Sequence, residues 1–127
     1  SRSDYQLSIP ARKVRQYKQG GLLEKVDPPK GPVPFDDPGL VNRIHYELKE
    51  PFAVFGLGNE EEQITIAEVG GAEVGSRLTF VSWTESDDSP FYCVEPWMAP
   101  PNAPEIKSAR FVPPSGRDEF TVEVQLA

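Results

Sequence analysis

The chain has 127 residues, which is enough for one domain and too few for two. Hydrophobic residues make up 38%, below the usual share, yet seven Phe, four Tyr and two Trp suffice to build a core. A formal net charge of -7 argues against nucleic-acid binding, because that function needs a basic surface.

Alternation of apolar and polar residues predicts strands along most of the chain. The pattern first appears at residues 5–9, returns at 64–69 and 78–84, and is clearest at 120–126. Because successive side chains of a strand point to opposite faces, each strand is expected to bury one face. In the third segment the predicted faces are Leu78, Phe80 and Ser82 on one side and Thr79, Val81 and Trp83 on the other.

Helix signals are nearly absent, because 14 prolines and 10 glycines interrupt most windows of helical length. The one helical candidate, residues 38–48, is short. Short strands separated by turns indicate an all-β antiparallel β-sandwich, with residues 1–127 forming a single domain. The predicted turns lie at residues 20–21, 56–59, 70–71, 86–90 and 113–116, and the proline-rich residues 27–39 are expected to form a stiff loop.

Two clusters of charge stand out in the sequence. Several cations lie near the start of the chain, and residues 59–62 form an acidic group. A solvated surface is the favoured explanation for both clusters, since charged side chains are mostly exposed, and docking patches are the alternative. The cations are Arg2, Arg12, Lys13, Arg15 and Lys18.

Cys93 is the only cysteine, so no internal disulfide is possible. This fits a reducing compartment or a plastid and disfavours a secreted scaffold, and Cys93 is expected to be a small buried side chain. No apolar run has the length of a membrane span, and no secretory signal is present. The start at Ser1 without Met indicates a processed, truncated or partly represented protein. Neither a zinc site, a calcium loop nor a nucleotide-binding loop is indicated, so no metal or cofactor is expected.

The most informative segment is residues 90–103, where an apolar run ends on a carboxylate. Residues 91–94 are predicted to form a buried strand, and Glu95 follows them directly. Pro96 keeps Glu95 extended, because the residue before a proline avoids helical geometry. Glu95 is therefore expected at the mouth of the strand, beside the Trp97 indole. A carboxylate in that place can act as a general base or accept the hydroxyls of a sugar.

Residues 91–103, with Glu95-Pro96-Trp97 followed by a turn of Pro and Asn, resemble the end of the aldose 1-epimerase (galactose mutarotase) family. Weaker matches follow the expected order at residues 8–11, 20–21, 31–36 and 78–84. The resemblance implies the C-terminal part of a galactose mutarotase-like supersandwich that is incomplete at its N-terminus. Such a half-sandwich would have open sheet edges and an uncovered apolar face, which other protein subunits would cover.

The resemblance assigns Glu95 as the general base of mutarotation, the reaction that exchanges sugar anomers. A relict or structural role, in which the carboxylate accepts backbone amides, is the alternative and is favoured for this chain. The reason is that the family's catalytic acid, a His, belongs upstream of Ser1. The lone His45 is expected to be structural or to titrate on the surface.

Substrate binding is assigned by the same resemblance to three further residues. Trp97 would stack on the sugar, although an indole there also suits a core or an interface. Asn42 falls where the family has an Asp, and an amide grips paired hydroxyls less well than a carboxylate. Asp36 and Asp37 are upstream alternatives for that role. Asn102 would contact substrate or fix the turn through its side chain.

Three functions are compatible with these features. The first is a mutarotase-like domain without a complete catalytic site that acts as a structural subunit of a larger protein assembly. A peripheral subunit of the chloroplast NAD(P)H dehydrogenase-like complex, on the stromal side of the thylakoid, is a similar case, so a chloroplast or cytoplasmic location is expected. The second is an aldose or hexose-phosphate 1-epimerase, an isomerase in which Arg77 or Arg110 would bind the phosphate. The third is a carbohydrate-binding module without catalysis.

Overall fold

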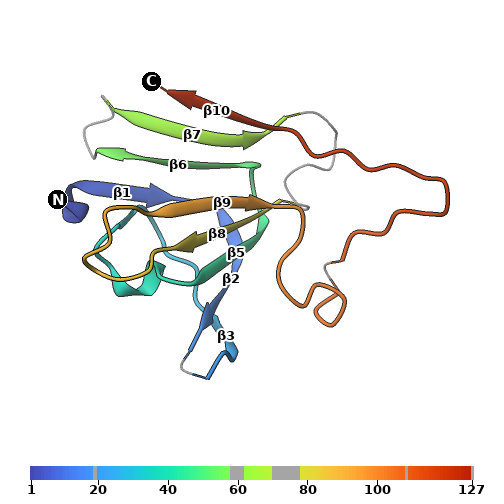
Figure 1. The fold of residues 1–127 in the computed structure, drawn as a ribbon, viewed down its shortest axis with the longest axis horizontal. Coiled ribbons are helices and arrows are strands. Elements are labelled where there is room, and N and C mark those ends of the chain that lie inside the picture. The colour runs from blue at the N-terminus through green and yellow to red at the C-terminus, as the bar shows by residue number, and fades with distance from the viewer. Residues whose placement is uncertain (19, 58–61, 70–77, 108, 127) are drawn as a thin grey trace.

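The described part of this computed structural model consists of two antiparallel five-stranded sheets with a hydrophobic core between them (Figure 1). The structure describes residues 1–18, 20–57, 62–69, 78–107 and 109–126. Sheet A has the strand order β10-β7-β6-β1-β4, and sheet B has the order β3-β2-β5-β8-β9. The predicted all-β antiparallel sandwich is therefore confirmed.

Strands dominate the regular structure of the described residues, and the helices are limited to single short turns. Sheet A contains β1 (Tyr5–Ser8), β4 (Val33–Pro34), β6 (Phe52–Leu57), β7 (Gln63–Glu68) and β10 (Val122–Leu126). Sheet B contains β2 (Ala11–Tyr17), β3 (Leu23–Val26), β5 (Arg43–Leu48), β8 (Thr79–Trp83) and β9 (Cys93–Trp97). The 3-10 helices are η1 (Arg2–Asp4) and η2 (Pro38–Leu40). In the ranges described, no helix has the length and apolarity needed to cross a membrane.

The main core lies between the inner faces of the sheets. Leu7 and Ala53 contribute to it from sheet A, and Val14, Leu48 and Phe80 from sheet B. Phe80 is 0% exposed, so its ring is fully removed from water. Burial of such side chains is the main favourable term in folding. The resemblance implies an uncovered apolar face, yet the chain's own second sheet covers much of the inner face of the first.

Strand β8 has the alternation that the sequence predicts. Leu78 and Phe80 pack in the main core, whereas Val81 joins Ile44 and Tyr46 in a second buried cluster. This second cluster lies on the outer face of sheet B, and Leu23 and Ile106 pack against it. The centre of the outer face is therefore covered by side chains from β3 and from the segment after β9.

The helix considered for residues 38–48 is wrong beyond its first turn. Asp37 caps η2, because its Oδ1 accepts from the backbone N–H of Gly39 at 2.7 Å, and the helix ends at Leu40. Asn42 then adopts a positive φ of 54°, after which the chain enters β5. Strand β5 pairs with β2 on one side and β8 on the other. These pairings join residues that are distant in sequence, so the sequence of residues 38–48 alone does not reveal them.

Strand β9 lies later in the chain than the sequence predicts. The prediction is a strand over residues 91–94. The observed strand begins at Cys93 and continues through Pro96 to Trp97. β9 is the outermost strand of sheet B, and proline is accommodated there because an edge strand does not need every backbone donor. Cys93 is half-buried and not fully buried as expected.

Strand β10 buries less of its apolar face than its alternation predicts. Val122 packs against the core, but Val124 and Leu126 are 60% and 79% exposed. Both pair with β7, opposite Ile66 and Ile64 respectively. β10 is the outermost strand of sheet A, at the top of Figure 1, and its second edge has no partner strand among the described residues.

The turns predicted at residues 20–21, 86–90 and 113–116 agree with the structure, whereas residues 56 and 57 of the turn predicted at 56–59 lie in strand β6. Gly20 and Gly21 have φ of 91° and 77°, a conformation that glycine adopts at little cost. The proline-rich residues 27–39 contain only the short strand β4 and the start of η2. The turn predicted at residues 70–71, residues 58–59, most of the acidic group at 59–62 and Arg77 lie outside the described residues.

Candidate functional site

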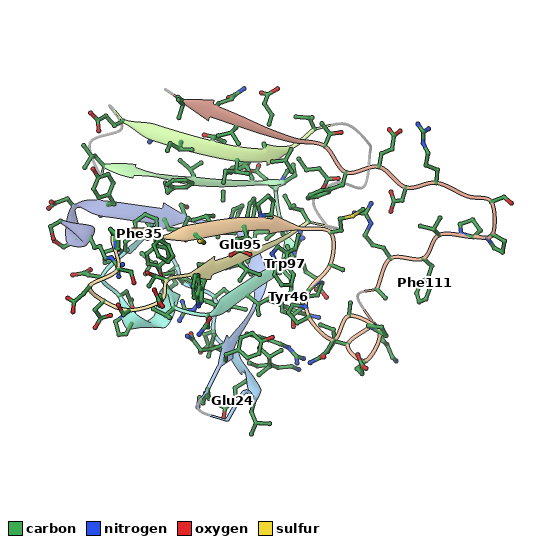
Figure 2. The ribbon with its side chains drawn as sticks, viewed as in Figure 1. Glu24, Phe35, Tyr46, Glu95, Trp97 and Phe111 are labelled. Carbon is green, nitrogen blue, oxygen red and sulfur yellow. The ribbon has the colours of Figure 1, made fainter. Side chains whose placement is uncertain are left out.

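Glu95 and Trp97 lie on strand β9 and share the outer face of sheet B (Figure 2). Glu95 pairs with Val81 and Trp97 with Thr79, and residues directly opposite one another share a face. The Trp97 indole donates its Nε1–H to Oε2 of Glu95 at 3.0 Å. The expected proximity of carboxylate and indole is therefore observed. Glu95, however, lies in the middle of a strand and not at its mouth as expected.

The Glu95–Trp97 pair presents an aromatic surface next to a carboxylate. Trp97 is 39% exposed, and Glu95 is half-buried. The indole occupies one carboxylate oxygen, Oε2, and Oε1 has no hydrogen-bond partner within the described ranges. An exposed indole can stack on the apolar face of a sugar while a carboxylate accepts its hydroxyls. The same two side chains also suit the centre of a protein interface.

His45 is not placed to act as the acid partner of Glu95. It lies on β5, is 2% exposed, and faces the inner side of sheet B. Its Nε2 lies 3.1 Å from Oγ of Ser82, and that hydroxyl donates its proton to the Leu40 carbonyl at 2.6 Å. Burial is the main cause that lowers the pKa of His45 to about 3, and the nearby charge of Arg43 adds to it. His45 is therefore a neutral structural residue, one of the two roles expected for it.

The two candidate asparagines contribute to turns through their backbones. Asn42 and Asn102 have φ of 54° and 57°, a left-handed conformation in which Asn is enriched. The Asn42 carbonyl accepts from the N–H of Tyr17, and the Asn102 carbonyl accepts from the N–H of Ile106, both at 3.2 Å. Neither asparagine hydrogen-bonds to Glu95 within the described structure. Substrate binding by these residues stays a prediction.

The remaining described candidates lie apart from Glu95, and two of them, Asp37 and Arg110, have partners of their own. Asp37 caps η2, and Asp36 is exposed in the loop before it. Arg110 forms an ion pair with Asp118, with 2.6 Å between Nη2 and Oδ2, in the long segment between β9 and β10. None of these side chains contacts Glu95 through a hydrogen bond or ion pair in the described ranges. The candidate site is therefore the Glu95–Trp97 pair.

A row of directly opposed residues crosses the outer face of sheet B from β9 to β3. One end of the row is the carboxylate of Glu95, the middle is buried and apolar, and the other end is basic. Because neighbouring strands lie about 4.8 Å apart, three spacings separate Glu95 from the first cation by roughly 14 Å. In order, the row contains Glu95, Val81, Ile44, Arg15 and Lys25.

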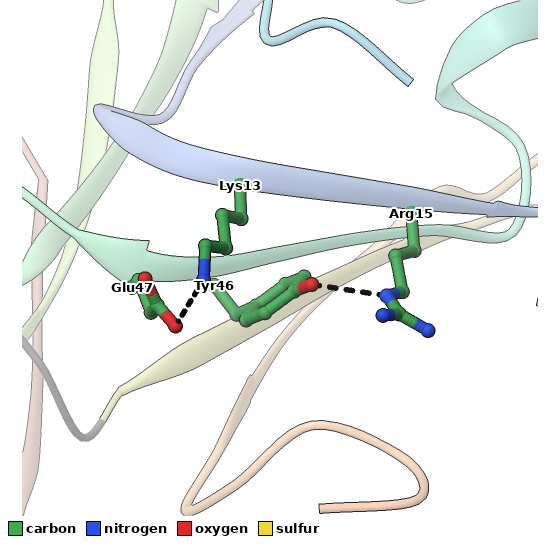
Figure 3. Close-up of polar contacts among 4 residues, drawn as sticks. All are labelled: Lys13, Arg15, Tyr46 and Glu47. Atoms are coloured by element: carbon green, nitrogen blue, oxygen red, sulfur yellow. Dashed lines mark hydrogen bonds and ion pairs between the residues drawn. The ribbon is translucent and has the colours of Figure 1, made fainter. Parts of the chain in front are cut away.

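The basic end of the row contains contacts that the sequence alone does not single out. Lys13 forms an ion pair with Glu47, with 2.9 Å between Nζ and Oε1. Arg15 donates its Nε–H to the hydroxyl of Tyr46 at 3.0 Å (Figure 3). Alternation along β2 is the available sequence signal, because it places Lys13, Arg15 and Tyr17 on one face. Their neighbours on β3 and β5 depend on strand register, which the sequence does not reveal.

An apolar cavity of about 560 Å³ opens between the two sheets. Because Val94 lines this cavity and the adjacent Glu95 points to the opposite face, the cavity is separate from the Glu95–Trp97 pair. Burial raises the pKa of Tyr92, another lining residue, to about 12, so its hydroxyl is neutral at physiological pH. The other apolar lining residues include Phe35, Phe55, Ile64 and Leu126.

No protein-family model matches the chain, and neither does a curated protein or a solved structure. The resemblance to aldose 1-epimerases therefore stays a prediction from the sequence around Glu95, Pro96 and Trp97. The β-sandwich architecture depends on the strand pairings described above.

Proposed function

We propose that this chain is a mutarotase-like β-sandwich without a complete catalytic site, and that it serves as a structural subunit of a larger protein assembly. The outer edge of β10, which has no partner strand in the described part of the chain, is the observation that carries the proposal. Val124 and Leu126 are 60% and 79% exposed there, and Leu126 also lines the inter-sheet cavity. Unpaired backbone groups combined with exposed aliphatic side chains form a surface that favours association with a partner.

The composition of the Glu95 site supports the lack of catalysis. Mutarotation needs a base and an acid that act on the same sugar, and a missing acid costs a factor on the order of 10²–10⁴. Glu95 would supply the carboxylate of the base. His45, the only histidine of the chain, is buried on the other face and stays neutral.

Val124→Lys is expected to release the chain from its assembly, because the added charge would lie on the inward face of the β10 edge. A tagged wild-type chain in a chloroplast or cytoplasmic extract should elute far above its own mass of 14.1 kDa. Val124→Lys should elute as a monomer. Gln125→Lys is the matched control, since Gln125 lies on the opposite face of the same strand, and it should remain in the assembly.

The behaviour of the unmodified protein decides the proposal. Recovery of the wild-type chain as a free monomer would contradict it. A monomer that exchanges sugar anomers faster than buffer, and loses this activity on Glu95→Gln, would replace the proposal with an active epimerase.

Carbohydrate binding without catalysis is a second candidate function. The hydrogen bond between Glu95 and the exposed Trp97 is the observation that favours it. In this alternative the indole stacks on the sugar, and the free oxygen of Glu95 accepts a hydroxyl. The buried centre of the outer face would limit the ligand to the β9 side of sheet B.

Hexoses at millimolar concentration are expected to change the fluorescence of Trp97 if this second function is correct. Trp83→Phe leaves Trp97 as the only indole, because the chain contains two Trp. In that background, Glu95→Gln should weaken binding about tenfold through loss of a charge-assisted hydrogen bond. Unchanged fluorescence with several hexoses would exclude this function, since Trp97 is accessible to solvent.

A further inference from the structure

The outer face of strands β2 and β3 concentrates positive charge in an otherwise acidic protein. Lys13 and Arg15 lie on β2 and Lys25 on β3, and the register places Arg15 directly opposite Lys25. Tyr46 shares this face, because it is opposite Lys13 on the neighbouring strand β5. These cations lie at the far end of the row from Glu95, so they form a separate region of sheet B.

The charges of Arg15 and Lys25 are not compensated within the described structure. Like charges directly opposite one another on neighbouring strands are destabilising. Lys13 is offset by its ion pair with Glu47, but neither Arg15 nor Lys25 has an ion-pair partner among the described residues. The chain contains 20 acidic residues against 13 basic ones, so acidic side chains are abundant in the molecule. An anion bound from solution would relieve this repulsion.

Tyr46 orients the guanidinium of Arg15 for such an anion. The Tyr46 side chain is 3% exposed, and its hydroxyl accepts the Nε–H of Arg15 at 3.0 Å. The two Nη nitrogens make no hydrogen bond among the described residues, because the contact with Tyr46 in Figure 3 is made by Nε alone. A guanidinium held by Nε keeps its other nitrogens available to bind two oxygens of one anion.

A surface hollow beside Tyr46 provides space for a ligand. It has a volume of about 220 Å³, and Arg12, Lys13 and Lys25 contribute its cationic lining. Asp27 is the one acidic side chain among its lining residues in the described structure. The Arg12 guanidinium also donates to the Leu48 carbonyl at 3.1 Å, which fixes it at the hollow. With Lys13 paired to Glu47, Arg12 and Lys25 still outnumber Asp27, so the hollow has an excess of positive charge in an acidic chain.

We propose that Arg15, Lys25 and the adjoining hollow form a binding site for a phosphate monoester. The two nitrogens of the Arg15 fork would bind two phosphate oxygens, and Lys25 would bind as a point charge from β3. A phosphate monoester has a charge of about -1.5 to -2 at neutral pH, which matches two uncompensated cations. The inference is independent of the proposed assembly function, because it uses neither β10 nor the Glu95–Trp97 pair.

Titration with phenyl phosphate, followed by the backbone amide signals in NMR spectra, tests this inference. The whole chain is used, at constant ionic strength. Saturable shifts are expected for amides of β2 and β3 around Arg15 and Lys25. Arg15→Gln and Lys25→Gln should each weaken binding about tenfold or more. Arg117→Gln removes the same charge from a side chain that is 82% exposed in the loop before β10, and it should leave binding unchanged.

Arg15→Lys separates a specific site from simple charge attraction. This variant keeps the charge and loses the planar fork, so its affinity should fall below that of the wild type. Equal affinity of Arg15→Lys and the wild type would overturn the assigned geometry. Absence of saturable shifts, or an equal loss of affinity in Arg117→Gln, would also overturn the proposal. The amide spectrum of each variant shows in the same experiment whether the chain is folded.

Discussion

Lowering the pH from about 7 to about 5 is expected to decrease the free energy of unfolding by roughly 2 kcal/mol through His45 alone. In the folded chain the pKa of His45 is about 3, against an ordinary value of 6.5. When the pH is below 6.5, His45 binds a proton in the unfolded chain but not in the folded chain. The stabilising contribution is therefore complete above pH 6.5 and is lost progressively as the pH falls toward 3.

Denaturant unfolding at a series of pH values measures this effect. His45→Gln is the matched variant, because an amide retains a hydrogen-bonding group toward Ser82 and does not titrate. The chain has a single histidine, so the variant should lose most of the pH dependence between about 7 and 5, where carboxylates remain largely ionised. The comparison uses the slope against pH and not the absolute stability of the variant. An equal slope in both proteins would contradict the burial of a neutral His45.

Phe80→Ala is expected to destabilise the fold by about 3–5 kcal/mol. Phe80 is 0% exposed and lies in the core between the two sheets. Truncation removes the transfer free energy of the ring and leaves a cavity that rigid sheets fill only in part. Because small domains are stable by only about 5–15 kcal/mol, this loss is a large share of the total.

Phe111→Ala is the control for the Phe80 experiment. Phe111 is 87% exposed in the segment between β9 and β10 (Figure 2), so its truncation should change stability by less than about 0.5 kcal/mol. Phe80→Leu gives a measurable intermediate if Phe80→Ala does not fold. Thermal or denaturant unfolding of the three variants gives the comparison. Similar losses for Phe80→Ala and Phe111→Ala would contradict the described core.

The sequence predicts the alternation of side chains along a strand, because this alternation is a local property. Phe80 in β8 and Leu78 just before it alternate with Val81, and the structure packs Phe80 and Val81 on opposite faces of sheet B as expected. Strand β10 shows the limit of this reasoning. Its alternation identifies an apolar face. Whether Val124 and Leu126 on that face are covered depends on how far sheet B extends over the edge of sheet A. The extent of one sheet over the other is a property of the whole fold, so the sequence of one strand does not predict it.

Proline has a different meaning at an edge from the one it has inside a sheet. Pro96 suggests that the strand ends at Val94, yet β9 continues to Trp97 because it is the outermost strand of its sheet. The helix predicted over residues 38–48 is wrong for a related reason. Strand β5 is stabilised by pairing with β2 and β8 and not by its own propensity. Both errors arise from pairing between distant segments.

In the candidate site, too, the sequence predicts contacts between neighbours in the chain but not contacts between distant strands. Glu95 and Trp97 are two residues apart, so a strand conformation alone brings their side chains together, and the sequence is sufficient to predict this contact. The contact between Arg15 and Tyr46 and the opposition of Arg15 and Lys25 join residues on three strands. Their register is fixed by tertiary pairing, so the sequence shows only a group of cations near the start of the chain.

Pro96 also has a consequence for how this molecule could polymerise. Strands at the margins of a sheet can template fibres, and a missing backbone donor, charged side chains or a short length each hinder such growth. β9 contains Pro96, β3 contains Glu24 and Lys25, and β4 has two residues. Among the described strands, β10 alone combines five residues with uncovered aliphatic side chains. Among the described strands, a further strand can therefore be added at one sheet edge, that of β10. A chain with one such edge forms closed complexes in preference to open fibrils.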